Sequence, residues 1–219
     1  MSIYLVKTPS IFQNYFPNFT WRIPTQEKVI YLTFDDGPTP EVTPWVLEQL
    51  AQYRAKATFF AIGKNIIQFP ELYNQVTDAG HTVGNHSYSH LNGWAVDSIP
   101  YFHNVRHGAR LVNSDLFRPP FGRLMPKQAQ FLQRHYNIVM WDVLSGDFDP
   151  NISNEKCLRN VTKNAKPGSI VVFHDSQKAK EKLEFTLPKV LQHYAELGYS
   201  FAALNDQIIS GSVQHKKTA

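Results

Sequence analysis

The sequence predicts one α/β domain, a parallel (β/α) barrel of about seven strands that is complete or partly open. Short apolar runs rich in β-branched and aromatic residues alternate with longer segments whose apolar residues recur at helical spacing. This alternation is typical of βαβ units and a parallel sheet or barrel. The chain of 219 residues also suits a single domain, and about seven strands within it favour a barrel over an open doubly wound sheet.

Each expected strand is a short apolar run that ends in turn-forming or polar residues. The first covers 29–34 and runs into Asp35 and Asp36, after which Gly37-Pro38 breaks the chain. The remaining strands are expected at 57–62, 81–86, 116–118, 138–141, 169–174 and 199–202.

The segments between the strands carry helical signals. Thr39 and Pro40 suit an N-cap and a first helical position, and the apolar residues from Val42 to Tyr53 follow at helical spacing. Gly80 and Gly198 stop two later helices, as glycine commonly does at a helix C-terminus. We therefore expect helices at 42–53, 65–79, 97–113, 126–134, 154–163 and 183–197, with a short helix after the last strand.

The sequence divides into three parts. Residues 1–27 are rich in aromatic side chains but lack periodicity, which indicates an N-terminal arm that packs over an open end of the barrel. Residues 28–210 form the main domain, and residues 211–219 form a flexible basic tail.

Composition excludes several classes of protein. The net charge is +4, and the Lys and Arg residues are scattered rather than clustered, which favours acidic surfaces or anionic glycans over nucleic acid as partners. The single cysteine, Cys157, excludes an intrachain disulfide. No segment approaches the roughly 20 apolar residues that a membrane span needs. No glycine-rich phosphate loop is present, which weakens nucleotide-binding interpretations.

The first residues contain no basic segment followed by a long apolar one, so no signal peptide is visible. We therefore expect a cytoplasmic location, with an extracytoplasmic one open if a leader is missing. The sequence does not determine the oligomeric state.

Polar and ionisable residues recur where the expected strands end. In parallel α/β folds these ends line one face, which is the usual place for an active site. Five groups fall there: Asp35 with Asp36, His86 with His90, Arg118, the segment 142–149 with its Asp residues, and His174 with Asp175.

A metal site is one interpretation of these groups. His86 and His90 are four residues apart, so one helical turn would bring both imidazoles to one side. With a carboxylate from another strand end they would form a two-His, one-carboxylate set with positions open for water or substrate. No Glu follows His86, so a base must come from elsewhere. One Asp of the pair Asp35-Asp36 could bind the metal while its neighbour handles the proton; alternatively, Asp36 simply caps the turn before Gly37.

Arg118 and His174 each have two interpretations. Arg118 stands before Pro119-Pro120 on a rigid backbone, where it would face a carboxylate and keep it ionised, or it forms a surface ion pair. His174 is either a buried, hydrogen-bonded strand residue or a general acid. A neighbouring carboxylate would raise the pKa of His174 above about 6.5 and keep it protonated for that second role.

Taken together and in this order, the motifs resemble those of the polysaccharide deacetylases of carbohydrate esterase family 4, the NodB-homology domain. The resemblance extends from about Lys28 to Leu204. It is carried by Thr33-Phe34-Asp35-Asp36-Gly37, His86-Ser87-Tyr88-Ser89-His90, Arg118-Pro119-Pro120-Phe121-Gly122, Asp147-Phe148 and Val172-Phe173-His174. The family fold is a distorted (β/α) barrel, in agreement with the alternation above, and 28–210 would be its catalytic domain.

The resemblance assigns roles to these residues. It implies that Asp36, His86 and His90 bind a divalent metal, with zinc expected and cobalt or nickel as alternatives. It further implies that Asp35 is the catalytic base, steadied by Arg118, and that His174 is the general acid, oriented by Asp147. Phe121 would offer its backbone N–H to the oxyanion and contact substrate, and Val172 would line the pocket for the acetyl methyl group.

The sequence departs from the family pattern at two positions that bear on substrate preference. Phe148 stands where the family often has a Trp that lines the sugar groove, and Leu144 stands where another Asp is frequent. Together with Trp94 and Tyr101, Phe148 is a candidate wall residue. Asp142 and Asp149 lie close to Asp147, so either could replace it as the partner of His174.

The implied function is metal-dependent removal of N-acetyl groups from a poly- or oligosaccharide that contains N-acetylglucosamine. A chitin oligomer, peptidoglycan, an exopolysaccharide and a lipid-linked precursor are all candidate substrates. One alternative is a NodB-like deformylase or amidase that acts on a smaller or lipid-linked sugar or on a cyclic amide. A second alternative is a catalytically dead relative that only binds carbohydrate.

Overall fold

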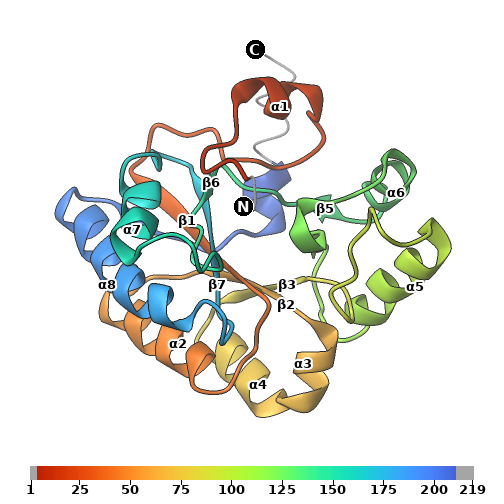
Figure 1. Ribbon diagram of the computed structural model, residues 1–219, viewed down its shortest axis with the longest axis horizontal. Helices are drawn as coiled ribbons and strands as arrows, with labels where there is room; N and C mark the ends of the chain where they lie inside the picture. The colour runs from red at the N-terminus through yellow and green to blue at the C-terminus, as the bar shows by residue number, and fades with distance from the viewer. Residues whose placement is uncertain (1–3, 211–219) are drawn as a thin grey trace.

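The structure is a computed structural model that describes residues 4–210, so the expected basic tail at 211–219 lies outside the described residues. Its sheet has the strand order β5-β4-β3-β2-β1-β7-β6, and every pairing in it is parallel. The strands are β1 (Val29–Asp35), β2 (Thr58–Ala61), β3 (Thr82–Asn85), β4 (Leu116–Phe117), β5 (Asn137–Ile138), β6 (Val143–Leu144), β7 (Ile170–His174) and β8 (Ser200–Phe201). β8 pairs with the start of β1, beside this path. The curled, partly open sheet confirms the predicted (β/α) barrel (Figure 1).

Helices follow most strands and cover the outside of the sheet (Figure 1). They are α1 (Ser10–Tyr15), α2 (Val42–Gln52), α3 (Gly63–Gln68), α4 (Pro70–Asp78), α5 (Ser98–Ala109), α6 (Pro126–Leu132), α7 (Asn154–Thr162) and α8 (Lys180–Glu196), with a 3-10 turn η1 at Pro120–Gly122. The single helix expected at 65–79 is wrong. Phe69 leaves the helical conformation between α3 and α4, because Pro70 disfavours helical backbone at the residue before it and starts a new helix instead.

The centre of the sheet is β1, in which all seven residues are buried. Alternation along this strand sends Ile30, Leu32 and Phe34 outward into the core beneath the helices, whereas Val29 and Tyr31 belong to the core inside the curl. The same alternation places Thr33 and Asp35 on the inner face. The chain therefore brings a carboxylate to the inside of the barrel, at the carboxyl end of its most buried strand.

The N-terminal arm lies along the open edges of the sheet. Thr20 forms a parallel bridge with Val139, just after β5, and Lys7 forms an antiparallel bridge with Val143 of β6. Phe19 and Trp21 are buried in a core cluster with residues of α5, β4, α6 and β5. The arm thus contacts both edge strands, β5 and β6. Among the described residues, no helix combines the length and hydropathy needed to cross a membrane.

Candidate active site

The site lies at the carboxyl ends of β1, β3, β4 and β7 and in the loop after β6. Asp35 and His174 end adjacent strands and are register partners, so the two residues stand side by side. Asn85, which precedes His86, pairs with Phe117, which precedes Arg118. The pairing of parallel strands alone therefore gathers four of the sequence-predicted residues at one end of the barrel.

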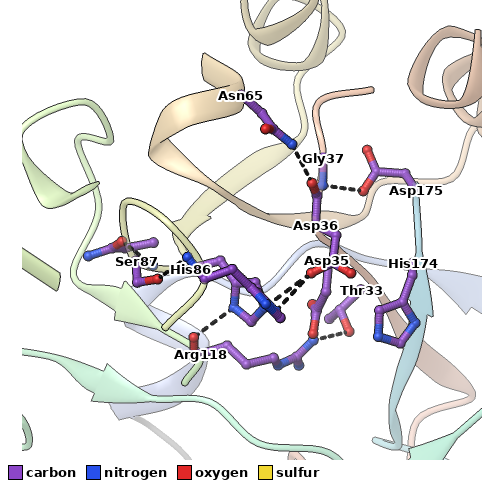
Figure 2. A network of polar contacts seen from close by, with 12 residues as sticks. Thr33, Asp35, Asp36, Gly37, Asn65, His86, Ser87, Arg118, His174 and Asp175 are labelled. Atoms are coloured by element: carbon purple, nitrogen blue, oxygen red, sulfur yellow. Dashed lines mark hydrogen bonds and ion pairs between the residues drawn. The ribbon is translucent and has the colours of Figure 1, made fainter. Parts of the chain in front are cut away.

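Asp35 and Asp36 are separated by the backbone rather than left to repel each other. Asp35 is buried at the end of β1, whereas Asp36 has a positive φ of 79° and leaves the strand. The Asn65 side chain donates a hydrogen bond to the carbonyl of Asp36 at 2.7 Å, and the next N–H, that of Gly37, donates to Asp175 at 3.1 Å (Figure 2). The turn backbone is thus fixed on both sides, and the two carboxylates face different neighbours.

Arg118 is fully buried and is the ion-pair partner of Asp35. Its Nη1 donates to Asp35 Oδ1 and to Thr33 Oγ1, both at 2.7 Å (Figure 2). Its other nitrogens donate to the carbonyls of Val139 and Met140, and the guanidinium lies 4.2 Å from the centroid of the Phe60 ring. The surface ion pair considered for Arg118 is therefore wrong, because the side chain crosses the barrel interior with its charge fully engaged.

Asp36, His86 and His90 converge, with candidate ligand atoms all within 4.8 Å of one another. Asp36 Oδ1 lies 3.1 Å from His90 Nε2 and 3.6 Å from His86 Nε2. The expected helical turn from His86 to His90 is wrong. The segment is a loop in which Ser87 and His90 have positive φ, and this reversal, rather than helical spacing, brings the two rings together.

Hydrogen bonds to the side chains of two Asn residues and one Ser hold this loop. Asn85 accepts a hydrogen bond from the N–H of Ser87, and the Ser87 hydroxyl accepts one from the N–H of His90. Asn104 of α5 accepts from the N–H groups of Tyr88 and Ser89. Side chains therefore satisfy the backbone donors that a helix or strand would have paired, which allows left-handed residues to persist there.

The donor atoms fit a divalent cation. His86 Nδ1 lies 2.7 Å from the carbonyl oxygen of Arg118, which can only accept, so Nδ1 carries the proton and Nε2 presents a lone pair to Asp36. Although two imidazoles face it, Asp36 Oδ1 is buried with no hydrogen-bond donor of good geometry among the described residues. Burial raises the pKa of Asp36, but hydrogen bonds from His86 and His90 in their protonated forms, together with the charge of His174, lower that pKa well below its usual range. When His86 and His90 are neutral, a bound cation would take the place of those protons. An ionised oxygen that faces imidazole lone pairs is the environment that a metal ion stabilises.

His174 is paired with Asp147. The Asp147 carboxylate faces His174 Nδ1 at 2.8 Å and accepts the His174 backbone N–H at 2.7 Å. Burial lowers the pKa of His174, but the charge of Asp147 and its hydrogen bond raise it more, with Asp36 and Asp35 adding to the effect, to about 9. The ring is therefore protonated at neutral pH, and Nε2 is the ring N–H that does not face Asp147.

The other two candidate partners of His174 are engaged elsewhere. Asp142 forms an ion pair with Lys7 at 2.6 Å and accepts a hydrogen bond from Ser169. Asp149 accepts hydrogen bonds from Asn151. The structure therefore places Asp147, and neither of its neighbours, against His174.

The residues predicted to contact substrate differ in their exposure and in the side chains against which they pack. Phe121 and Trp94 are exposed, and the Phe121 ring packs edge-on against His90 at 4.5 Å between centroids. Phe148 is half-buried and packs edge-on against His174 at 5.1 Å. Val172 is buried two residues before His174 on β7. Tyr101, also considered as a wall residue, is fully buried in the core with Phe117 and cannot contact substrate.

Sequence reasoning assigned no role to the residues that fix the turn after β1. Asp175 is buried, and its two oxygens accept from the Gly37 N–H and the Thr43 hydroxyl. Burial raises the pKa of Asp175 to about 8, against the opposing effect of the Thr43 hydrogen bond. The only signal in the sequence was that Asp175 directly follows His174 at a strand end.

Comparisons with known proteins agree on one family. Residues 22–140 match the sequence model described as polysaccharide deacetylase. A peptidoglycan-N-acetylglucosamine deacetylase of Bacillus cereus is 36% identical over 199 residues, which cover 85% of this chain and 91% of that protein. A chitooligosaccharide deacetylase of Azorhizobium caulinodans is 34% identical over 165 residues, which cover 70% and 77%. The crystal structure of the Bc1960 peptidoglycan N-acetylglucosamine deacetylase superposes with a TM-score of 0.81 at 30% identity and covers 90% of this chain and 95% of that one.

Proposed function

The chain belongs to the polysaccharide deacetylase family, and from this premise we propose that it is a metal-dependent hydrolase that removes N-acetyl groups from a poly- or oligosaccharide containing N-acetylglucosamine. The observation that carries the proposal is the placement of Asp35 and His174 as neighbours at two strand ends, one paired with Arg118 and the other with Asp147. A carboxylate base and a protonated imidazole acid are thus available to one substrate.

Asp36, His86 and His90 would hold the metal, which we propose to be zinc, with cobalt or nickel able to use the same donors. When bound, such an ion lowers the pKa of a coordinated water towards 7 and polarises a carbonyl group. The Arg118 carbonyl would fix the tautomer of His86 so that Nε2 remains a ligand.

The proton transfers follow from the two ion pairs. Arg118 engages Oδ1 of Asp35, which leaves Oδ2 to take the proton of the water that attacks the carbonyl carbon. The backbone N–H of Phe121 would donate to the oxyanion, and one such donor is typically worth about 3–4 kcal/mol. As the C–N bond breaks, His174 Nε2 gives its proton to the departing amine, so the products are acetate and a free amino sugar.

An oligosaccharide is favoured over a small, enclosed substrate. Phe121 contacts the proposed metal ligand His90, and both Phe121 and Trp94 are exposed; such exposed aromatic faces suit a sugar chain that extends past the reacting unit. The dead-relative alternative is not favoured, because a candidate for every ionisable role is present in one cluster.

The proposal is tested with Asp35→Asn, in which the amide can still accept the Arg118 hydrogen bond. We expect the variant to bind zinc as the wild type does but to release acetate from chito-oligosaccharides about 10²–10⁴-fold more slowly, the usual contribution of a general base. Metal content and acetate release are the measurements. Asp78→Asn, an exposed carboxylate on α4, is the matched control. Full activity in Asp35→Asn would overturn the assignment of the base.

A further inference from the structure

Arg123 lies between two exposed aromatic rings at the edge of the site. Its guanidinium carbon is 5.0 Å from the centroid of the Trp94 ring and 5.9 Å from that of Phe121. Phe121 in turn contacts the proposed metal ligand His90. Cation–π contacts on two sides restrict the long Arg side chain to one region of the surface. The positive charge of Arg123 is therefore held near the proposed metal site, with the Phe121 ring between Arg123 and His90.

The two loops that carry these residues are joined by buried polar contacts. Gln128 is fully buried, and its amide donates to the carbonyls of Gly93 and Val96 while its oxygen accepts the N–H of Met125. Trp94 Nε1 donates to the carbonyl of Leu124 at 3.1 Å. Gly93 has no room for a side chain, because a Cβ there would meet the carbonyl oxygen of Arg123. These contacts hold Trp94, on one loop, in a fixed position relative to Phe121 and Arg123, on the other.

The charge of Arg123 is unmatched. Within residues 4–210, no carboxylate lies within ion-pair distance of its guanidinium, in contrast to Arg118, whose charge is paired with Asp35. Ring contacts orient a guanidinium but leave its N–H groups available. The donors of Arg are arranged to match a carboxylate, and a guanidinium held in place loses little entropy when it binds one.

We propose that Arg123 binds a carboxylate on the sugar unit next to the one that is deacetylated, so that the site prefers an anionic glycan chain to a neutral one. Trp94 provides the stacking surface for that chain, and Arg123 binds the carboxylate that the chain carries. The inference rests on the proposed function and narrows its substrate class to N-acetylated glycans with carboxylate-bearing neighbours. The net charge of +4 supports association with such a polymer.

The test compares two substrates and three variants of the intact chain loaded with zinc. The substrates are chitotetraose, which is neutral, and a peptide-free tetrasaccharide of alternating N-acetylglucosamine and N-acetylmuramic acid, whose lactyl groups carry carboxylates. We expect Arg123→Gln to lower kcat/KM on the acidic tetrasaccharide about tenfold, mainly through KM, and to leave chitotetraose within about twofold. Arg123→Lys should recover part of the loss, and Lys127→Gln, an exposed cation on the adjoining helix α6, should change neither substrate.

A third substrate separates charge from shape. This substrate is the same tetrasaccharide with its lactyl carboxylates converted to methyl esters. We expect the kcat/KM of the wild type on the ester to equal that of Arg123→Gln on the free acid. If Arg123→Gln slows both tetrasaccharides equally, Arg123 only supports the Trp94 surface and the proposal is wrong. If wild-type protein releases acetate from none of the three, the proposed function fails instead, and that result is distinguishable because it does not depend on residue 123.

Discussion

The two halves of the site are held by different parts of the molecule. On the base side, Arg118 donates to Thr33, Asp35 and two backbone carbonyls inside the barrel, so its geometry depends on core strands. On the acid side, Asp147 stands in the loop after β6, and the arm covers this edge. The N–H of Leu144 donates to the carbonyl of Val6, and the Tyr4 ring packs on Phe148 at 5.2 Å. Phe148 in turn contacts His174. The base is therefore positioned by the core of the fold, whereas the acid depends partly on the N-terminal arm.

The largest expected effect comes from breaking the base side. Arg118→Met leaves the Asp35 carboxylate buried without its partner, and such a loss typically costs about 3–5 kcal/mol. We expect the free energy of unfolding of the metal-free protein, measured by urea denaturation, to fall by about that amount, and deacetylation to be lost. The double variant Arg118→Met/Asp35→Asn removes the stranded charge as well and should regain part of the stability. A single variant as stable as the wild type would show that the core does not hold this pair.

The base side was also the easier half to predict from sequence. An apolar run that ends on Asp35 fixes both the strand and the end of the barrel on which the residue lies, because burial and periodicity are local properties of the chain. A metal site at His86 and His90 with one Asp of the pair was one interpretation of the residues alone, and the family resemblance assigned the ligand role to Asp36. The loop geometry that joins the two His residues came from neither, since it depends on Asn85 and on Asn104, a residue of a separate helix.

The acid side of the site could be predicted only in part from the sequence. Three Asp residues within 142–149 lie close together in the sequence, and only their partners in space distinguish them: Lys7 of the arm engages Asp142, Asn151 donates to Asp149, and Asp147 is left to pair with His174. β6 was not predicted, because its two residues are defined by their pairing with β7 and the arm. Long-range pairing, which leaves no local pattern in the sequence, determines this half of the site.

Removal of the charge at Asp147 should have an intermediate effect that depends on pH. The pKa of His174 is raised to about 9 chiefly by Asp147, working against burial, so Asp147→Asn should move the alkaline limb of kcat/KM towards the ordinary value of about 6.5 or below. The raised pKa of His174 also makes the stability of the folded protein depend on pH. A folded pKa above the unfolded one stabilises the protein fully below about pH 6.5, and this contribution is lost as pH rises through about 9.

Two measurements check this prediction. The pH dependence of kcat/KM reports the alkaline limb, and urea denaturation at pH 6 and pH 9 reports the stability linked to His174. Asp149→Asn is the matched control, because Asp149 lies in the same loop but bonds to Asn151 instead of His174. An alkaline limb that stays in place in Asp147→Asn would mean that Asp147 does not set the protonation of His174.

The smallest expected effect tests whether the arm helps to position the acid. Tyr4→Ala removes the ring that supports Phe148 against His174, and we expect kcat on chitotetraose to fall about three- to tenfold with KM and zinc content unchanged. This is below the roughly 100-fold that a 1 Å misplacement near a reacting centre can cost, because Asp147 still holds His174 by two hydrogen bonds. Tyr4→Phe should keep most of the activity, and Ile11→Ala, an exposed arm residue on α1, should keep all of it.

The leaving group decides what the loss in Tyr4→Ala means. Hydrolysis of 4-nitrophenyl acetate expels a phenolate that needs no proton, so a defect in the acid alone should spare this ester while it slows the amide. His174→Gln sets the reference, since it should slow the amide far more than the ester. If Tyr4→Ala slows both substrates equally, the arm contributes only to general stability and the two halves of the site do not differ in the way proposed. If amide hydrolysis alone is slowed, the arm acts through Phe148 on the proton that His174 delivers.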